Sequence, residues 1–418
     1  GVGGLSLVFG LTTAWIVTRY NFFGKKFFEW MLLLPAAVPA YIIAYTYTDF
    51  FEYAGPLQSL LRDIFGWTSS KDYWFPNVRS MGGAILVMSS VLYPYVYLMT
   101  RASFITTPIS FFQTSSIYGR NSFFNVAIPF GRPGIIAGLA LVLMETISDF
   151  GTVDYFAIET LTLGVFNVWL GMNSLSGASQ ISSILFMIVI VLLTLEYLGR
   201  RSRKFHEKYS GASYTPTQTV SGIKNSLLFL ICLIPLSLGF IIPVSILLNF
   251  VIKGYSIINF LEIFQITLSS ISLAFISSSF IMLLSLLMII VGAYKSNNFQ
   301  KILIFFASSG YAFPGTILAV GIVVFVGWLN DLIYFRMSYA VGGFIILLFA
   351  YSIRFLAVGN GAITSGISRI HPNLLDASRT MGVSFFKSIR KIILPLLYTN
   401  LLVGGILVFV DILKELPI

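Results

Sequence analysis

Four carboxylates stand out in this largely apolar sequence, and they form two pairs with the same spacing. Glu145 precedes Asp149 by four residues, and Asp411 precedes Glu415 by the same interval. Residues four apart share one face of a helix. A carboxylate at the centre of a bilayer costs about 2.5–3.5 kcal/mol, so such residues are expected to face a cavity or a partner. Because their hard oxygen ligands suit a hard cation, we predict that these pairs line a substrate path.

Two other roles for the same acids remain open. The pairs are also compatible with a hydrated position at the outer membrane interface, or with pairing to Lys414 or to residues of the opposite half. No tightly bound metal is predicted, since the only cysteine, Cys232, lies in an apolar run and the two histidines, His206 and His371, are far apart. No set of nucleophile, base and metal ligands points to an enzyme.

The composition excludes a soluble protein. Apolar residues make up 57% of the 418 residues, charged residues make up 10%, and the mean hydropathy is +0.88, whereas soluble domains carry about 25% charged residues. A helix needs roughly 20 apolar residues to cross a bilayer, and the runs lack the alternation of an outer-membrane barrel. We therefore expect an all-α polytopic membrane protein. Its ten candidate spans are 2–18, 27–50, 81–100, 134–150, 179–198, 225–250, 266–294, 301–328, 338–357 and 397–413.

The distribution of lysine and arginine predicts the orientation of these spans. Most of the 26 Lys and Arg residues fall in one alternate set of loops, and the acidic residues lean to the other set. By the positive-inside rule the basic loops are cytoplasmic, which accounts for the net charge of +10 without a nucleic-acid partner. Arg354 is assigned to this cytoplasmic set, where its side chain is expected to snorkel to the interface.

Polar motifs repeat in two of the cytoplasmic loops and indicate an internal duplication. Gln113-Thr114-Ser115, Gly119 and Pro129 in the first loop correspond to Asp376-Ala377-Ser378, Gly382 and Pro395 in the second. Each proline precedes a span whose far end carries one of the acid pairs, at the same distances in both copies. Further upstream, Pro39-Ala40-Tyr41 resembles Pro314-Gly315-Thr316. The sequence thus predicts two homologous halves.

The predicted halves are 1–198 and 225–418, joined by a cytoplasmic linker at 199–224. Pairing the spans of the two halves leaves 225–250 without a first-half partner and 179–198 without a second-half partner. We therefore expect that one helix precedes the first half and that at least one follows the second half. The intact protein would then have about twelve spans, six in each half.

The repeated loops resemble the EAA loop of ABC importer permeases. The second copy is the better match, because its proline lies 13 positions after its glycine. In the first copy the proline lies only 10 positions after the glycine, and Gln113 replaces the acid. The resemblance implies that the loop residues couple the membrane domain to a cytoplasmic ATPase. These residues are Gln113, Thr114, Ser115, Gly119, Pro129, Asp376, Ala377, Ser378, Gly382 and Pro395.

Such a loop suits a mechanical role. A short helix parallel to the membrane, with small residues on one side, fits a groove of an ATPase, and glycine lets the chain turn sharply into the next segment. An ordinary basic loop with one helical turn is the alternative for either copy alone. Two copies at equivalent positions favour the coupling role.

The resemblance extends along nearly the whole chain to the fused two-half permeases for ferric iron. The stretches that carry it are 28–35, 54–56, 148–156 and 411–417. It implies a place in the bacterial inner membrane, a dimer of cytoplasmic ABC ATPase subunits and a periplasmic substrate-binding protein. Because the sequence has no P-loop pattern, ATP and Mg are expected on the partner ATPase. This chain is then a non-hydrolytic subunit with no cofactor of its own.

Two alternatives to a ferric-iron importer remain open. Related permeases carry thiamine, polyamines, phosphonates or oxyanions, and specificity can reside largely in the binding protein. A second class is the ion-coupled secondary transporter with twofold repeats, which needs no ATPase and places its charged coupling residues near the midplane.

Overall fold

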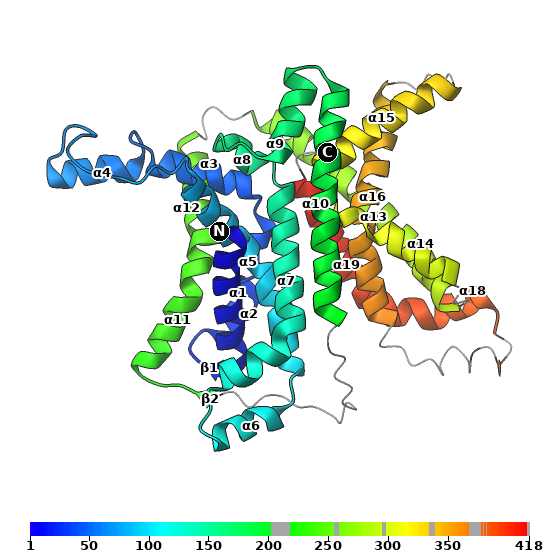
Figure 1. Ribbon diagram of the computed structural model, residues 1–418, viewed down its shortest axis with the longest axis horizontal. Coiled ribbons are helices and arrows are strands. Elements are labelled where there is room, and N and C mark those ends of the chain that lie inside the picture. Colours follow the sequence, from blue (N-terminus) through cyan, green and yellow to red (C-terminus); the bar gives the residue numbers. More distant parts are fainter. Residues whose placement is uncertain are drawn as a thin grey trace. The chain divides into compact units, whose positions relative to one another are not determined.

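The computed structural model describes residues 1–201, 218–254, 259–294, 298–333, 339–367, 378, 380–381 and 383–415. Within these ranges the chain is almost entirely helical (Figure 1). Its contacts divide it into two compact units, Gly1–Ile257 and Ile258–Ile418. Each unit has an apolar core of its own.

Unit 1 combines long apolar helices with shorter elements at their ends. The long helices are α1 Val2–Arg19, α5 Met81–Thr106, α7 Ile128–Ser148 and α10 Leu175–Arg201. The shorter elements are α2 Lys25–Met31, η1 Leu34–Ala37, α3 Ala40–Phe51, α4 Pro56–Phe65, α6 Ile109–Ile117, η2 Phe123–Ala127, α8 Gly151–Tyr155, α9 Leu161–Phe166 and η3 Asn167–Gly171. Helices α1, α5 and α7 form the centre of the unit, where they pack against one another.

Glycines allow α5 to pack closely against both neighbours. Gly10 of α1 and Gly138 of α7 both lie against Val96 of α5. A Cβ added at Gly138 would come within 2.7 Å of the Val96 Cα, and one at Gly10 within 2.5 Å of the Val96 Cβ. Because only a residue without a side chain permits this approach, a larger residue at either position would separate the helices.

The segment that follows the predicted linker packs on unit 1. It consists of α11 Ile223–Leu236, the π-helical turn η4 Ser237–Ile241 and α12 Ile242–Gly254. A short parallel pairing of β1 Tyr20–Asn21 with β2 Gln218–Thr219 fixes its start beside the end of α1.

Apolar packing explains why α11 belongs to this unit. Cys232 and Leu236 are fully buried, in the same cluster as Phe28 and Tyr93. By packing, the chain therefore divides after α12. The predicted halves 1–198 and 225–418 describe homology rather than packing, and they stay a prediction.

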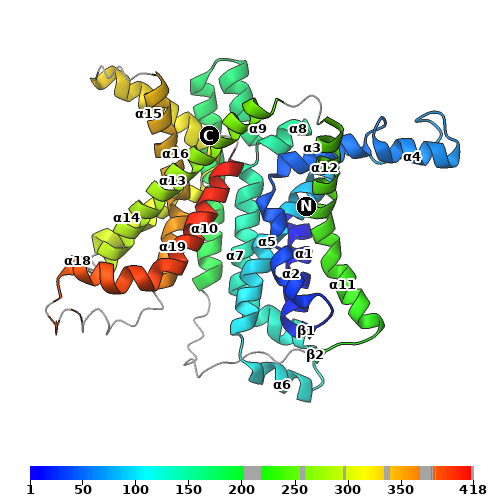
Figure 2. The same ribbon diagram turned by 180° about the vertical axis from the view of Figure 1, so that it is seen from behind.

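Unit 2 is built around three helices that pack against one another, α13, α16 and α19 (Figure 2). Its elements are α13 Phe260–Tyr294, α14 Asn298–Ser308, η6 Gly310–Ala312, α15 Gly315–Ile333, α16 Tyr339–Ile367, α18 Phe385–Ser388, η7 Ile389–Ile393 and α19 Leu394–Lys414. Ile281, Ile363 and Leu397 are fully buried between these three helices. Gly404 of α19 lies against Ala362 of α16, which repeats the close approach of Gly138 to α5.

The predicted fold class is confirmed: the chain is an all-α, polytopic membrane protein. In the part of the chain that the structure describes, 8 helices are long and apolar enough to cross a membrane, or up to 9 if one bent pair counts as a single span. Two of the predicted spans are interrupted. In 27–50 the chain bends by 90° between Lys25–Ala37 and Ala40–Phe65, and in 301–328 the turn η6 separates α14 from α15.

Both interruptions occur at the duplicated prolines. Pro39 and Pro314 have no N–H to donate, and each disfavours a helical conformation in the residue before it. Val38 and Phe313 are accordingly extended, with ψ of 125° and 131°. The predicted spans 27–50 and 301–328 are therefore broken at these prolines, for the same reason in both units.

Candidate coupling loops and acidic pairs

The first candidate coupling loop contains a tight turn that depends on glycine. Gly119 follows α6 with φ of +63°, a left-handed conformation that costs other residues about 1–2 kcal/mol. Its amide donates to the Ser116 carbonyl (3.1 Å), and the Arg120 amide donates to the Ser115 carbonyl (2.9 Å). These two bonds form a Schellman motif, so Gly119 ends α6 and reverses the chain toward α7.

The second loop repeats one of these bonds. The Val383 amide donates to the Ser378 carbonyl (3.1 Å) across the same five-residue interval. Asp376, Ala377 and Gly382 lie outside the described residues. Ser378 therefore occupies the position in its turn that Ser115 occupies in the first.

A contact between two serine hydroxyls closes each loop. Ser122 donates to Ser115 (3.4 Å), and Ser378 and Ser388 are hydrogen-bonded to each other. The two serines are 7 residues apart in the first loop and 10 apart in the second. The three-residue difference in glycine-to-proline spacing thus falls between the glycine and the second serine. The shorter first loop keeps the same closure.

Both loops lead into their spans through the same π-helical turn. η2 and η7 contain 5 residues each, directly follow the second serine, and run into α7 and α19, which contain 21 residues each. Pro129 and Pro395 lie in the first turn of these spans. A proline inside a regular helix clashes with the carbonyl four residues earlier, and a π-helical turn changes this register. The proline and the π turn therefore occur together.

Aromatic contacts attach the first loop to its unit. Phe112 of α6 is buried, and the Arg19 guanidinium at the end of α1 lies over its ring at 5.1 Å. The Phe111 and Phe130 rings, from α6 and the start of α7, are 4.5 Å apart between centroids. α6 is therefore in contact with two of the central helices, α1 and α7.

The sequence analysis missed the large apolar side chains that are exposed on the surface of both loops. Ile117 and Tyr118 are 82% and 75% exposed, and Met381, at the position of Tyr118 in the second copy, is 79% exposed. Gln113 and Thr114 are exposed on the same helix, whereas Ser115 is buried. The available signal was a large apolar residue directly before the loop glycine in both copies.

Removing the second-loop closure tests its contribution. Ser388→Ala is expected to lower the free energy of unfolding by about 1–3 kcal/mol, because it leaves the buried Ser378 hydroxyl without its partner. Ser122→Ala should cost less than about 1 kcal/mol, since Ser115 still donates to the Arg120 carbonyl (3.1 Å). Thermal unfolding in detergent measures both. Equal losses of stability in the two variants would contradict the larger contribution of the Ser378–Ser388 hydrogen bond.

The first acidic pair lies at the outer end of α7, where Asp149 serves the next helix. Its carboxylate accepts hydrogen bonds from the Thr152 amide (2.9 Å), the Val153 amide (3.3 Å) and the Thr152 hydroxyl (3.0 Å). These are the bonds of an N-terminal cap for α8. Glu145 lies one turn earlier on α7 and is half-buried.

The second acidic pair is engaged by cations. Asp411 Oδ1 lies 2.8 Å from Lys414 Nζ, and Glu415 Oε2 lies 2.9 Å from Arg354 Nε. Both members of the second ion pair are 7% exposed at their side chains. The pairing with Lys414 that the sequence left open is thus present. A role of Glu145, Asp149, Asp411 and Glu415 in a substrate path stays a prediction.

Arg354 does not snorkel to the cytoplasmic interface. It is buried within α16, where it pairs with Glu415 and donates from Nη1 to the Phe313 carbonyl (2.9 Å). Phe313 immediately precedes Pro314 at the helix break, where its backbone is extended with ψ of 131°. Arg354 therefore joins the break to the end of α19. Its assignment to the cytoplasmic loops was wrong, since sequence position alone does not give depth.

In unit 1 the equivalent positions of α5 and α7 are not joined by an ion pair. Gly134 of α7 lies against Met99, and its counterpart Asn400 of α19 donates to the Ala362 carbonyl (3.3 Å). This register places Val91 at the position of Arg354. Val91 is buried in an apolar cluster, while the acid Asp149 caps α8. The two units therefore have a similar backbone arrangement in these helices but differ in the chemistry at the ends of α7 and α19.

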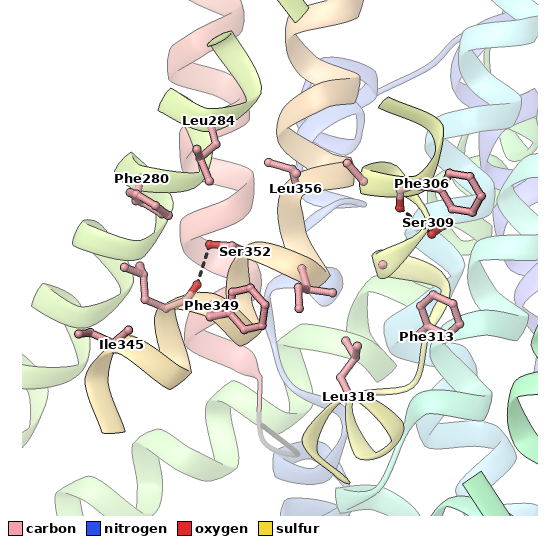
Figure 3. Close-up of a pocket in the computed structure, with 14 residues that line it drawn as sticks. Phe280, Leu284, Phe306, Ser309, Phe313, Leu318, Ile345, Phe349, Ser352 and Leu356 are labelled. Carbon is pink, nitrogen blue, oxygen red and sulfur yellow. Dashed lines mark hydrogen bonds between the residues drawn. The ribbon is translucent and has the colours of Figure 1, made fainter. Parts of the chain in front are cut away.

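One pocket in the described part of unit 2 is lined by side chains that do not suit a hydrated cation. It encloses about 560 Å³ and is lined mainly by aromatic and aliphatic side chains, among them Phe280, Phe306 and Phe349 (Figure 3). Its hydroxyls already donate to backbone carbonyls, Ser309 to Phe306 (2.7 Å) and Ser352 to Leu348 (2.6 Å). Among the described residues no three His, Cys, Asp or Glu side chains group as metal ligands. The expectation of no tightly bound metal is left as a prediction.

The chain is similar to known bacterial permeases. It is 24% identical to the Fe(3+)-transport system permease of Haemophilus influenzae over 99% of its own length and 77% of that protein. It is 23% identical to the ferric transport system permease of Actinobacillus pleuropneumoniae over 98% of its length, which is 61% of that protein. The molybdenum transport system permease of Haemophilus influenzae is 28% identical over 48% of this chain and 88% of its own length.

The permeases differ in how much of the chain they match. No protein-family model matches the chain. The ferric-iron permeases match it from end to end, and the shorter molybdenum permease matches about half of it. The chain is thus a multi-pass membrane protein that resembles the permeases of bacterial ABC importers, with similarity to the ferric-iron permeases along 99% of its length.

Proposed function

We propose that this chain is the transmembrane permease of an ATP-driven importer that moves ferric iron from a periplasmic binding protein into the cytoplasm. The observation that carries the proposal is the pair of equivalent loops. In each loop an amide donates to a serine carbonyl five residues earlier, that of Ser115 or Ser378. In each loop the same serine is also hydrogen-bonded to a second serine, and a π-helical turn leads into a long span. Two similar loops in the basic, cytoplasmic set could each bind one subunit of an ATPase dimer.

The cargo is proposed on the extent of similarity. Ferric-iron permeases match nearly the entire chain, whereas the molybdenum permease covers 48% of it. Carboxylates are hard ligands of the kind that a trivalent iron prefers. Permeases for another small solute, such as thiamine, a polyamine or a phosphonate, form the alternative within the same class.

The proposed mechanism is alternating access driven from the loops. Closure of an ATPase dimer around ATP and Mg would displace the exposed face of α6, which includes Tyr118, and the equivalent face at Met381. The contacts of Phe112 and Phe111 carry this displacement to α1 and α7. ATP hydrolysis takes place on the partner, and the binding protein delivers the cargo on the outer side.

Uptake by proteoliposomes tests the proposal. The full-length chain is reconstituted with and without its ATPase, and radiolabelled ferric iron is supplied on its binding protein. Uptake is expected only when both ATPase and ATP are present, and unlabelled molybdate should not compete. Uptake driven by an ion gradient with this chain alone would instead identify a secondary transporter.

A charge-removing change at Asp149 tests the acidic path. Asp149→Asn should keep α8 capped, because asparagine caps helices as well as aspartate does. If the charge lines the path, ferric-iron uptake should fall by about tenfold, equivalent to about 1.4 kcal/mol in the barrier, while thermal stability stays unchanged. Uptake at the wild-type rate would remove Asp149 from the path.

A further inference from the structure

Helix α4 lies across the direction of the spanning helices. The chain bends by 90° between Lys25–Ala37 and Ala40–Phe65. Figures 1 and 2 both show α4 projecting sideways from α3, at the level of α8 and near the outer ends of α1, α5 and α7. The loop that contains α4 belongs to the outer set by the positive-inside rule. The helix therefore runs along the outer face of the membrane rather than through it.

The side chains of α4 are divided between two faces. Leu57, Leu60, Leu61 and Ile64 follow the i, i+3, i+4, i+7 spacing of an apolar stripe. Leu60 is 56% exposed, Ile64 is 64% exposed, and Phe65 at the end of the helix is 60% exposed. This stripe on α4 is called the apolar face.

The opposite face of α4 is hydrogen-bonded both to the chain at the end of α3 and to the segment that returns to α5. Gln58 Nε2 donates to the Phe51 carbonyl (2.7 Å) and Gln58 Oε1 accepts from the Tyr73 hydroxyl (2.5 Å). Arg62 Nη1 donates to the Tyr53 carbonyl (2.8 Å) and to the Tyr73 hydroxyl (3.0 Å). These bonds fix the rotation of α4 about its own axis.

This rotation points the apolar face toward the membrane. In both views the returning segment lies on the outer side of α4, away from the body of the bundle. Gln58 and Arg62 face that segment, as their hydrogen bonds to Tyr73 require. Leu60 and Ile64 project from the opposite side of the helix, and so toward the bilayer.

Aromatic residues just after α4 are of the kind found at the membrane interface. The Trp67 ring stacks on Phe65 at 4.8 Å and on Tyr73 at 4.6 Å between centroids. Trp74 is 84% exposed. The Asp72 carboxylate accepts from the amides of two residues earlier in the turn, which hold the pKa of Asp72 below its usual value. Tryptophan and tyrosine concentrate at the level of lipid headgroups.

We propose that α4 is an interfacial arm whose apolar face binds the outer leaflet of the lipid bilayer. An amphipathic helix of this kind lies in the membrane plane with its apolar side among the headgroups and upper acyl chains. A periplasmic protein would approach from the other side, which the returning segment already covers. The arm steadies the bend at Pro39 against the membrane.

Site-directed fluorescence in lipid tests the arm. Single cysteines at Leu60 and Ile64 are labelled with an environment-sensitive dye in the full-length protein, reconstituted in vesicles of phosphatidylethanolamine and phosphatidylglycerol. Ser70, which is exposed in the returning segment, is the matched control. The native Cys232 is fully buried, and unmodified protein measures its background labelling.

Brominated lipids should quench the dyes at Leu60 and Ile64 at least about threefold more than the dye at Ser70, as expected for a helix buried at the acyl boundary. Iodide in the buffer should quench in the reverse order. Two results would overturn the proposal: equal lipid quenching at all three positions, or protection from iodide at Leu60 and Ile64 that occurs only when the binding protein is added. Size-exclusion profiles identical to that of unlabelled protein establish that the variants are folded.

Discussion

Replacing Arg354 with methionine is expected to destabilise unit 2 by about 3–5 kcal/mol, because the change removes the guanidinium that pairs with the buried Glu415 carboxylate. The two charged groups are 2.9 Å apart and each side chain is 7% exposed, so water cannot take the place of the lost partner. The change also removes the donor to the Phe313 carbonyl at the helix break. The measurement is the midpoint of thermal unfolding in detergent, together with the yield of monodisperse protein.

Two further variants isolate the ion pair. Arg354→Met combined with Glu415→Leu should recover most of the stability, since a buried pair replaced by apolar side chains is often neutral or stabilising. Arg101→Met is the matched control in unit 1, because Arg101 lies 3.6 Å from Glu29 with both side chains about one quarter exposed, and it should cost about 1 kcal/mol or less. A single Arg354 variant as stable as the wild type would contradict the structural role, as would a double variant no better than the single one.

Replacing Gly119 with valine should uncouple ATP hydrolysis from uptake. Gly119 has φ of +63° and a Cβ there would meet nothing within 4 Å, so the effect is one of backbone conformation alone. A β-branched residue is strongly disfavoured in this region, and the turn that ends α6 is expected to open at a cost of about 1–2 kcal/mol. Under the proposed function, the surface that receives the ATPase would then be lost. We expect uptake to fall by at least about tenfold, roughly 1.4 kcal/mol, while ATP hydrolysis continues.

The chain supplies a close control for this backbone strain. Gly66 also ends a helix with a left-handed φ, +69°, and has nothing within 4 Å of an added Cβ. The Trp67 amide next to it donates to the Arg62 carbonyl (3.1 Å), as Arg120 does to Ser115. Gly66→Val should therefore impose the same local strain on the outer side of the membrane and leave coupling intact. Equal loss of uptake in both variants would mean that strain, not the coupling surface, is responsible.

Features set by short-range sequence patterns could be predicted. The apolar runs gave the spanning helices, and the motifs around Gly119 and Pro129 gave the position of the first loop. The turn at Gly119 could be anticipated because glycine is the residue that adopts a left-handed conformation without strain. The duplicated acids do lie at equivalent places, since Asp149 and Glu415 both follow their 21-residue helices with ψ of 124°.

Features that depend on helix rotation and depth could not be predicted. Arg354 and Glu415 are distant in sequence, and their contact requires α16 and α19 to present those two positions to each other. The depth of Arg354 in the membrane was misjudged, because nothing in the sequence of an apolar segment indicates which residue lies at the middle of the bilayer. The breaks at Pro39 and Pro314 were missed because membrane helices often tolerate proline when neighbouring groups satisfy the freed backbone. Here the chain turns instead.

Photo-crosslinking from the two loops tests most directly whether they receive an ATPase. A photoreactive amino acid is placed at Tyr118 and at Met381, which are both highly exposed, with Phe124, 63% exposed beside the first loop, as a control. In membranes that contain the complete transporter, both loop positions should crosslink to an ATPase with a P-loop, in a manner that changes with bound nucleotide, and Phe124 should give much less product. Transport-competent membranes in which neither Tyr118 nor Met381 crosslinks to such an ATPase would contradict the coupling role.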